Sequence, residues 1–425
     1  MPSSSATTPN TTTAFTGLAP YLRMSIAGAD VTPVAQQMLA LAQSQPEDAN
    51  LWMNLSIVLQ CLGQRDLGLH MQTQALSLQR VYHLAASQQP ARCRLLMLME
   101  PGDLAANTPL DCLLEDSDVE LLLYYLSPDE PLSIPLPEHD AVLVAMSDSD
   151  ANRAQLRFLE QALAHWPHPV INLPQFIPYV DRGTASELLQ NIPGLLMPPT
   201  LRATREQMQA VASGVSQLHS LFEDCDFPVI LRPLDSQGGR DLAKIETPED
   251  IVDYLSHVHD ADFFISRFTD YSHADGYFRK IRVALIDGQP YACHMAVSKN
   301  WMVHYVNAGM YEEAWKRAEE LAFMTVFETF QQRHHKVLQA IVRAIPLDYL
   351  CIDCAETASG ELLVFEVDHA MVIHAMDTED QFPYKQIHMQ KVKNAFRDLL
   401  LQRMAGHNTT PWSPTLPYNP MTGQP

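Results

Sequence analysis

Three acidic residues stand among apolar residues in the stretch CIDCAETASGELLVFEVD, which spans residues 351–368. The residues around Asp353, Glu366 and Asp368 are typical of a strand that is covered on both faces. Buried carboxylates are costly unless a cation or a hydrogen-bond donor pairs with them. Clustered carboxylates can hold divalent metal ions, so this stretch is the first candidate for chemistry. The alternative is a solvated sheet edge with ordinary surface acids.

The Ser-Gly step of the TASG segment predicts a turn between two strands. With a two-residue loop or a symmetric four-residue loop, residue 353 faces residue 366, and residue 351 faces residue 368. The Cβ atoms of such a pair lie about 4.5–5.5 Å apart, and residues two apart on a strand share a face. We therefore expect all three acids to converge on one patch.

Three adjacent carboxylates repel one another, and an empty patch would keep at least one of them protonated. We expect a bound cation to relieve this repulsion. Hard oxygen ligands suit Mg²⁺, which keeps some waters and binds through one or two carboxylates together with phosphate oxygens. The prediction is one or two Mg²⁺ ions at Asp353, Glu366 and Asp368, bridging a triphosphate.

Basic and glycine residues upstream favour a phosphate ligand. Arg232 follows the apolar pair Val229-Ile230, and a cation on a buried strand needs an anionic partner. A structural carboxylate is the alternative partner. The loop over residues 235–240 contains Gly238 and Gly239, which let backbone N–H groups approach phosphate oxygens closely. The loop matches neither the P-loop pattern nor the dinucleotide-binding pattern, and a Gly-Gly pair alone is weak support.

Two further segments complete a candidate nucleotide site. The stretch ISRFTD, residues 265–270, ends a predicted strand and offers main-chain groups and the Phe268 ring to a flat base. Arg282 lies on the next predicted strand, in RKIRVALIDG.

The elements that must position these residues begin with helices. From about residue 31 to 86, apolar residues recur at spacings of three and four. A Trp-Leu-Gly-Ala pattern within them resembles a tetratricopeptide-type helix pair, in which Trp52, Leu55, Gly63 and Ala75 would be packing residues. A plain helical cap on the next domain is the alternative.

From about residue 92, apolar strands alternate with an amphipathic helix over 152–166, which favours a small α/β sheet. The polar segment EPGDLAANTPLD follows the first of these strands, where open α/β sheets commonly place binding loops. A loop without a ligand is an equal alternative. Further strands follow from about residue 200, and a helical section over about 312–344 precedes the acidic hairpin.

Composition limits the partners. The chain has 425 residues, 28 basic and 50 acidic, and a formal net charge of −22, so its field repels nucleic acid and anionic membranes. The seven cysteines are odd in number and irregularly spaced, which favours reduced, mostly buried thiols. The N-terminus has no pattern of a secretory signal. We expect a soluble, cytoplasmic protein.

Together these features resemble the ATP-grasp superfamily, in its glutathione synthetase and RimK-like ligase branch. The resemblance covers roughly residues 92–405. It implies an α/β chain with an α+β ATP-grasp fold, a small Rossmann-like domain before it and an all-α N-terminal region. We expect a disordered tail over 1–18, a tetratricopeptide-like domain over 19–90, a pre-ATP-grasp domain over 91–200, an ATP-grasp domain over 201–405 and a disordered tail over 406–425.

The resemblance also implies roles for individual residues. The residues that would contact the ATP phosphates are Arg205, Arg232, Ser236, Gly238 and Gly239. Those that would contact adenine are Ser266, Arg267, Phe268 and Thr269. Arg282 and Asn307 would stabilise the transferring phosphoryl group and the intermediate, while Asp353, Glu366 and Asp368 match the magnesium motif. Two positions depart from the family pattern: Arg232 replaces a lysine, giving a less mobile fork, and Asp368 replaces an asparagine.

The implied activity is carboxylate–amine ligation with ATP through an acyl phosphate. It calls for positioning and charge neutralisation rather than a protein nucleophile. Trp301, His304 and Tyr305 would face the substrate, and a packed structural histidine is the alternative for His304. The expected partners are ATP, a carboxylate substrate and an amine from an amino acid, peptide or protein. A non-catalytic nucleotide-binding scaffold is the competing function, and a homodimer stays open.

Overall fold

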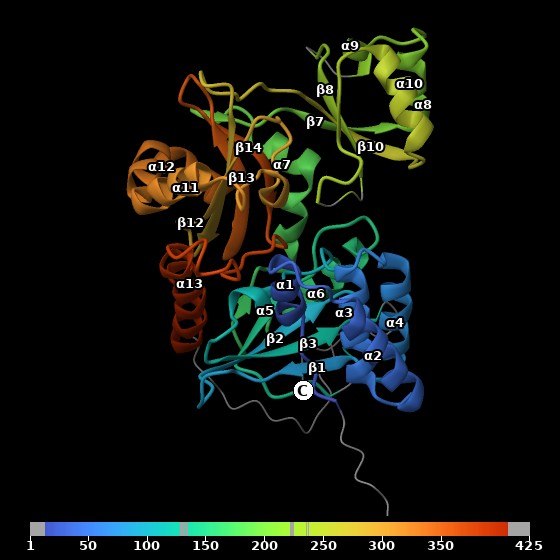
Figure 1. Ribbon diagram of the computed structural model, residues 1–425, viewed down its shortest axis with the longest axis vertical. Coiled ribbons are helices and arrows are strands. Elements are labelled where there is room, and N and C mark those ends of the chain that lie inside the picture. Colours follow the sequence, from blue (N-terminus) through green and yellow to red (C-terminus); the bar gives the residue numbers. More distant parts are fainter. Residues whose placement is uncertain are drawn as a thin grey trace, which may run out of the picture.

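The chain folds around three β-sheets with helices packed against them (Figure 1). The computed structural model describes residues 13–127, 132, 135–221, 225–234, 236 and 238–406. The predicted α/β class is confirmed. The tails expected over residues 1–12 and 407–425 lie outside the described residues.

The N-terminal region is helical, as predicted. Its helices are α1 (Ala19–Ile26), α2 (Thr32–Ser44), α3 (Ala49–Cys61) and α4 (Arg65–Leu78). Leu55 and Ala75 are fully buried between these helices and their neighbours, and Trp52 packs against the same core. Gly63 has φ +74° in the turn between α3 and α4, a conformation that favours glycine. The packing roles of these residues are thus seen, while the tetratricopeptide assignment stays a prediction.

Residues 13–18 are packed, so the prediction of a disordered tail up to residue 18 is wrong for this part. Phe15 and Leu18 are buried in the main core. The backbone N–H of Thr16 donates to Asn54 at 3.0 Å, and the N–H of Leu18 donates to Asp111 at 2.5 Å. Apolar residues at these two positions give the segment enough burial to offset the cost of ordering it.

The first sheet has the strand order β1-β3-β2-β4-β5. Its strands are β1 (Val81–Leu84), β2 (Cys93–Met99), β3 (Val119–Tyr125), β4 (Ala141–Val144) and β5 (Val170–Ile171), with α5 (Leu110–Leu113) and α6 (Arg153–Leu163) in the connections. Strands β2 to β5 are parallel and β1 is antiparallel to β3. The helix expected up to residue 86 ends at Leu78, because residues 81–84 pair with β3 and bury Tyr82. The helical region therefore ends before the boundary predicted at residue 90.

The second sheet, antiparallel with the order β7-β10-β8-β9, forms a lobe with its own core. It contains β7 (Thr200–Thr204), β8 (Val229–Pro233), β9 (Ala243–Ile245) and β10 (Asp262–Arg267), with α8 (Arg205–Ala212), α9 (Leu218–Leu221) and α10 (Pro248–His257). Figure 1 shows this lobe standing apart from the first sheet, at the upper right.

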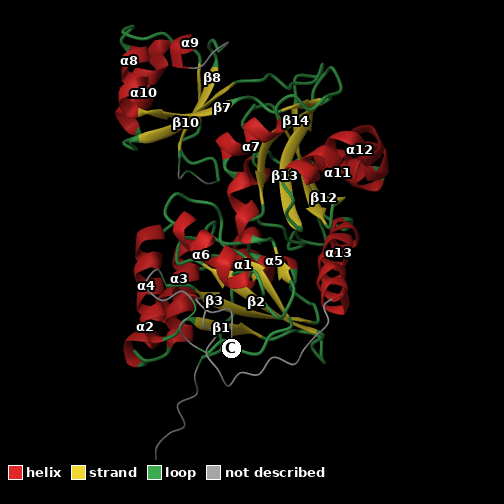
Figure 2. Ribbon diagram, turned by 180° about the vertical axis from the view of Figure 1, so that it is seen from behind, coloured by secondary structure: helices red, strands yellow, loops and turns green. Residues whose placement is uncertain are grey.

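The third sheet has the order β12-β11-β13-β14-β6. It contains β6 (Leu195–Leu196), β11 (Phe278–Ile286), β12 (Gln289–Ser298), β13 (Tyr349–Glu356) and β14 (Leu362–Asp368), with α11 (Ala314–Thr325), α12 (Phe327–Ala344) and α13 (Lys385–Gly406). The segment η1 (Pro174–Val180) and α7 (Arg182–Leu189) connect the first sheet to β6, and η2 (Tyr305–Asn307) follows β12. Figure 2 shows α7 between the first sheet and the upper lobes. Strand β6 lies before the boundary predicted at residue 200, yet it pairs with β14.

The described residues contain no helix of the length and apolar character needed to cross a membrane. All seven cysteines are free; six are buried and Cys61 is half-buried. The free and mostly buried thiols agree with the expectation from the sequence.

Asn172 joins the first sheet to the third. Its side-chain amide donates to the carbonyl of Tyr349 and accepts from the N–H of Tyr349, both at 2.9 Å. Asn172 is fully buried and has φ +55°. We expect Asn172→Ala to lower the free energy of unfolding by about 2–4 kcal/mol, because two buried backbone groups lose their partner. Urea denaturation measures this change.

Asn191→Ala is the matched control. Asn191 has φ +68° but is exposed, so this variant measures the strain of a left-handed alanine alone, about 1 kcal/mol. Equal losses in the two variants would show that the bridge to Tyr349 does not hold the sheets together.

Candidate active site

In the acidic hairpin the acids pair as predicted, but the turn and the register next to it differ from the prediction. Asp353 lies opposite Glu366 and Cys351 opposite Asp368, as expected. Nearer the turn the register differs, since Cys354 pairs with Val364 and the strands are joined by residues 357–361 rather than by a symmetric loop. A β-bulge between these registers adds Phe365 to β14, and this extra residue places Glu366 on the face of Asp353.

Two cations of the protein hold the carboxylate of Asp353. The Arg282 guanidinium binds it through Nε and Nη2 at 2.7 and 3.0 Å, and the Lys280 ammonium lies 2.7 Å from it. Burial would raise the pKa of Asp353, but these two cations outweigh burial and hold it below its usual range. Asp353 is only 2% exposed, so this pairing is the reason it can be buried.

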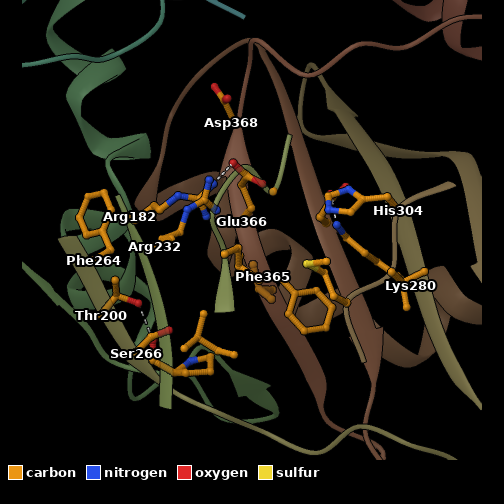
Figure 3. Close-up of a pocket in the computed structure, with 18 of the residues that line it drawn as sticks. Arg182, Thr200, Arg232, Phe264, Ser266, Lys280, His304, Phe365, Glu366 and Asp368 are labelled. Atoms are coloured by element: carbon orange, nitrogen blue, oxygen red, sulfur yellow. Dashed lines mark hydrogen bonds and ion pairs between the residues drawn. The ribbon is translucent and has the colours of Figure 1, made fainter. Parts of the chain in front are cut away.

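Glu366 has its own cation. Arg182, the first residue of α7, forms an ion pair with the Glu366 carboxylate, and the two side chains meet in Figure 3. Burial would raise the pKa of Glu366, but Arg182 and Arg232 keep it below its ordinary value. Arg282, Lys280 and Arg182 therefore neutralise Asp353 and Glu366 without a metal, which the sequence analysis did not foresee, whereas Asp368 still experiences the predicted repulsion from Glu366.

Arg232 on β8 is the least satisfied cation of the site. It is 7% exposed, it donates to the carbonyl of Ser236, and within the described residues its Nε has no partner. Burial and the nearby Arg182 guanidinium lower the pKa of Arg232 to about 9. The predicted alternative, a structural carboxylate bonded to Arg232, does not occur among the described residues, so its guanidinium is available to an anion in the pocket.

Asp368 is the least satisfied acid. Its carboxylate accepts the N–H of Ala370 at 3.0 Å, and it lies beyond Glu366 along the strand in Figure 3. Burial and the Glu366 carboxylate raise the pKa of Asp368 to about 6. Within the described residues no three His, Cys, Asp or Glu side chains are arranged to hold a metal ion. The donor type nevertheless suits Mg²⁺, which takes carboxylate oxygens.

These side chains line a pocket of about 420 Å³ between the second and third sheets. Most of the predicted site residues line it, namely Arg232, Gly238, Gly239, Ser266, Arg267, Phe268, Thr269, Arg282, Trp301, His304, Asp353, Glu366 and Asp368. One end has an apolar wall that includes Ile230, Leu242 and Leu363 beside the predicted hinge. The other end holds the cations and carboxylates. Leu104 and Ala105, from the polar loop after β2, also line the pocket.

Four predicted site residues do not line the pocket. Arg205 donates to the carbonyls of Leu255 and Val258 at the end of α10. Ser236 is buried and bonds to Arg232. The Tyr305 hydroxyl donates to Glu320 at 2.7 Å, and the Asn307 side chain accepts the N–H of His304 at 3.0 Å. Ser236 and Asn307 thus bond to residues that line the pocket. Arg205 and Tyr305 instead bond to residues outside it.

The sequence analysis missed Lys280 and Arg182. Lys280 is two residues before Arg282 on the same strand, so the alternation of a β-strand predicts that both share a face. Arg182 gave no comparable signal, because its approach to Glu366 depends on how α7 packs against the third sheet.

The close approach of His304 to the glycine loop gives a test. Gly239 has φ +77°, and a Cβ there would lie 2.3 Å from His304 Nε2. The sequence analysis predicts that this loop contacts ATP phosphates, and on that prediction we expect Gly239→Ala to displace the loop or the histidine and to raise the KM for ATP about tenfold or more. Steady-state ATP turnover measures it.

Gly238→Ala is its control, since Gly238 has φ +60° but no atom within 4 Å of the added Cβ. The same rise in KM for both variants would assign the effect to backbone strain instead of the contact with His304.

No family model and no curated protein matches the chain. Among solved structures, a D-alanine–D-alanine ligase from Bacillus anthracis complexed with ATP is similar at 13% identity and a TM-score of 0.43, over 74% of this chain and 98% of that one. A RimK domain ATP-grasp protein from Sphaerobacter thermophilus is similar at 14% identity and a TM-score of 0.40, over 74% of this chain and 100% of that one. The ATP-grasp ligase PsnB, complexed with a precursor variant, Mg and ADP, is similar at 14% identity and a TM-score of 0.40, over 73% of this chain and 98% of that one. Likeness at this level does not establish function, which rests on the geometry of the site.

Proposed function

We propose that the chain is an ATP-dependent carboxylate–amine ligase that forms an amide bond through an acyl phosphate. The observation that carries this proposal is the lining of the pocket, which combines two guanidiniums, those of Arg182 and Arg232, with the carboxylates of Asp353, Glu366 and Asp368 and with an apolar end. A nucleoside triphosphate has the matching shape, with a flat apolar base and an anionic tail.

The apolar end would hold the base. The hinge residues 266–269 offer backbone groups there, and the rings of Phe268 and Trp301 lie 5.7 Å apart in an edge-to-face arrangement. The Lys244 ammonium lies 4.4 Å from the centre of the Phe268 ring, within the range of a cation–π contact. This end has the aromatic and aliphatic lining that is common in small-molecule sites.

The polar end would hold the phosphates and the metal. Arg232 and Arg182 are placed to bind phosphate oxygens, for which a guanidinium fork is well suited. Asp353, Glu366 and Asp368 would hold Mg²⁺, which neutralises charge on the phosphate oxygens when it is bound. Phosphate would then replace Glu366 as the partner of Arg182, and Arg282 and Lys280 would turn from Asp353 toward the transferred phosphoryl group.

The cysteines near the site are not suited to act as covalent nucleophiles. Cys293 lies on the edge strand β12 and Cys351 and Cys354 lie on β13, and all three are buried. Burial raises the pKa of Cys293 to about 12, and the pKa values of Cys351 and Cys354 are raised as well. A thiolate is the reactive form, so these thiols are inert at neutral pH. The residues therefore position and neutralise the reactants, which is what acyl-phosphate chemistry needs.

A test of the proposal is to incubate the purified chain with ATP, Mg²⁺ and pooled amino acids or peptides. We expect ADP release and a product whose mass equals the two substrates minus water. ADP release without such a product would indicate a kinase and would contradict the ligase assignment.

A nucleotide-binding scaffold is the second candidate. The favouring observation is that the protein's own cations already neutralise the acidic patch, so the fold does not need a metal there. A scaffold would bind ATP in the same pocket without releasing ADP.

A further inference from the structure

A second, smaller pocket of about 70 Å³ shares a wall with the main pocket. Arg182, Glu366 and Asp368 line both. Its opposite wall comes from the loop after β4, with Asp148 and Asp150, and from Asp181 before α7. The small pocket is therefore adjacent to the position proposed for the phosphoryl group.

The small pocket has an excess of negative charge. Its lining contains five carboxylates and two guanidiniums, those of Arg182 and Arg202. Arg153 adds a third cation behind the loop, 3.0 Å from Asp148 and 3.6 Å from Asp150. Three cations against five carboxylates leave a field that attracts a positively charged ligand.

Asp148 supplies an acceptor that lacks a partner. Its side chain is 5% exposed, and Oδ2 accepts from Arg153 at 3.0 Å. Within the described part of the chain, its other oxygen, Oδ1, is buried and has no hydrogen-bond partner. Buried carboxylate oxygens are normally satisfied, so an orphaned one at a pocket wall indicates a donor that binds there.

The neighbouring carboxylates are already occupied. Asp181 caps α7 by accepting the N–H of Thr184 at 3.1 Å, and its other oxygen binds Arg202 at 3.0 Å. Asp150 binds Arg202 at 2.7 Å and is 62% exposed. Asp150 and Asp181 contribute long-range attraction, whereas Asp148 has a buried oxygen without a hydrogen-bond partner among the described residues.

From these observations we infer that the small pocket binds the primary ammonium group of the acceptor substrate, with Asp148 Oδ1 as its hydrogen-bond acceptor. The role of acceptor rests on the proposed ligase function. The size of the pocket fits a slim alkyl ammonium, and the shared wall of Glu366 and Asp368 places the amine beside the phosphoryl end of the main pocket.

Direct binding tests the inference without any turnover. Ligand-observed NMR titration of the full chain with n-butylammonium chloride should show saturable binding, and neutral n-butanol should not bind. In Asp148→Asn the dissociation constant should rise about tenfold or more, because the acceptor at this position loses its negative charge. Glu160→Gln, the same charge change on the exposed face of α6, should bind as the wild type does.

A second variant covers the case in which Asp148→Asn does not fold. Ser149→Lys introduces an ammonium into the lining and should abolish n-butylammonium binding. Two results would overturn the inference: no binding to the wild type, or equal binding to Asp148→Asn.

Two further probes identify the source of the ammonium. Binding of N-acetyl-lysine methylamide indicates a side-chain ammonium, and binding of glycinamide indicates an α-ammonium. Either result supports the inference. If n-butylammonium binds and no amide is ever formed, the ligase proposal fails while the ammonium site stands.

Discussion

Glu366→Gln is expected to abolish Mg²⁺-dependent ATP turnover, lowering kcat by about 10²–10³-fold. The exchange keeps the volume of the side chain and a hydrogen-bond acceptor for Arg182, but it removes one of the three carboxylate charges proposed to hold Mg²⁺. Loss of several kcal/mol of charge stabilisation corresponds to this fall in rate. Steady-state ADP release at saturating ATP measures it.

The fold should tolerate this change. Arg182 and Glu366 are 18% and 24% exposed, so part of the charge stays hydrated, and we expect a loss of less than about 2 kcal/mol in the free energy of unfolding. Glu361→Gln is the matched control, because Glu361 lies in the turn of the same hairpin, bonded to Ser359 at 2.8 Å. Normal turnover by Glu366→Gln would remove the metal assignment.

Arg232→Met should have opposite effects on stability and on nucleotide binding. Arg232 is buried, and its Nε has no partner among the residues that the structure describes. Replacing a poorly paired buried charge by an apolar residue is often neutral or stabilising. We expect the free energy of unfolding to rise by about 1 kcal/mol. The affinity for ATP should fall about 10–100-fold, because a charge-assisted contact with phosphate is lost.

Thermal unfolding and nucleotide titration on the same preparations measure the two effects. Arg240→Met is the control in the same loop, since Arg240 is 51% exposed and surface substitutions usually change stability by less than about 0.5 kcal/mol. If Arg232→Met destabilised the protein and left ATP binding unchanged, Arg232 would be a structural residue.

The pairing of the acidic hairpin could be predicted in part from its own sequence. The pairing of Asp353 with Glu366 was predicted, and it is confirmed. The assumed loop was wrong, and the register near the turn would have sent Glu366 to the opposite face. The bulge at Phe365 restores the pairing, and a bulge has no reliable sequence signal because it depends on how the strand bends within the sheet.

The expectations for the N-terminal tail and for strand β1 were wrong for a different reason. Residues 81–84 continue a helical apolar pattern, yet they form β1, because an edge of the first sheet is available to them. Residues 13–18 look like part of a polar tail, yet Phe15 and Leu18 are buried. In both cases a distant surface decides the conformation, and local propensity is overridden.

The sequence by itself determined the chemical types at the site and their order on strands: three carboxylates on one hairpin, Arg282 on a preceding strand and Arg232 before a glycine loop. These follow from periodicity, which is set by neighbours a few residues away. Only the tertiary structure decided which charges meet. Arg182 reaches Glu366 across 184 residues of chain, and the small acidic pocket joins six separate segments. Such contacts depend on how sheets and helices pack against one another, and that geometry is not encoded in any one stretch of sequence.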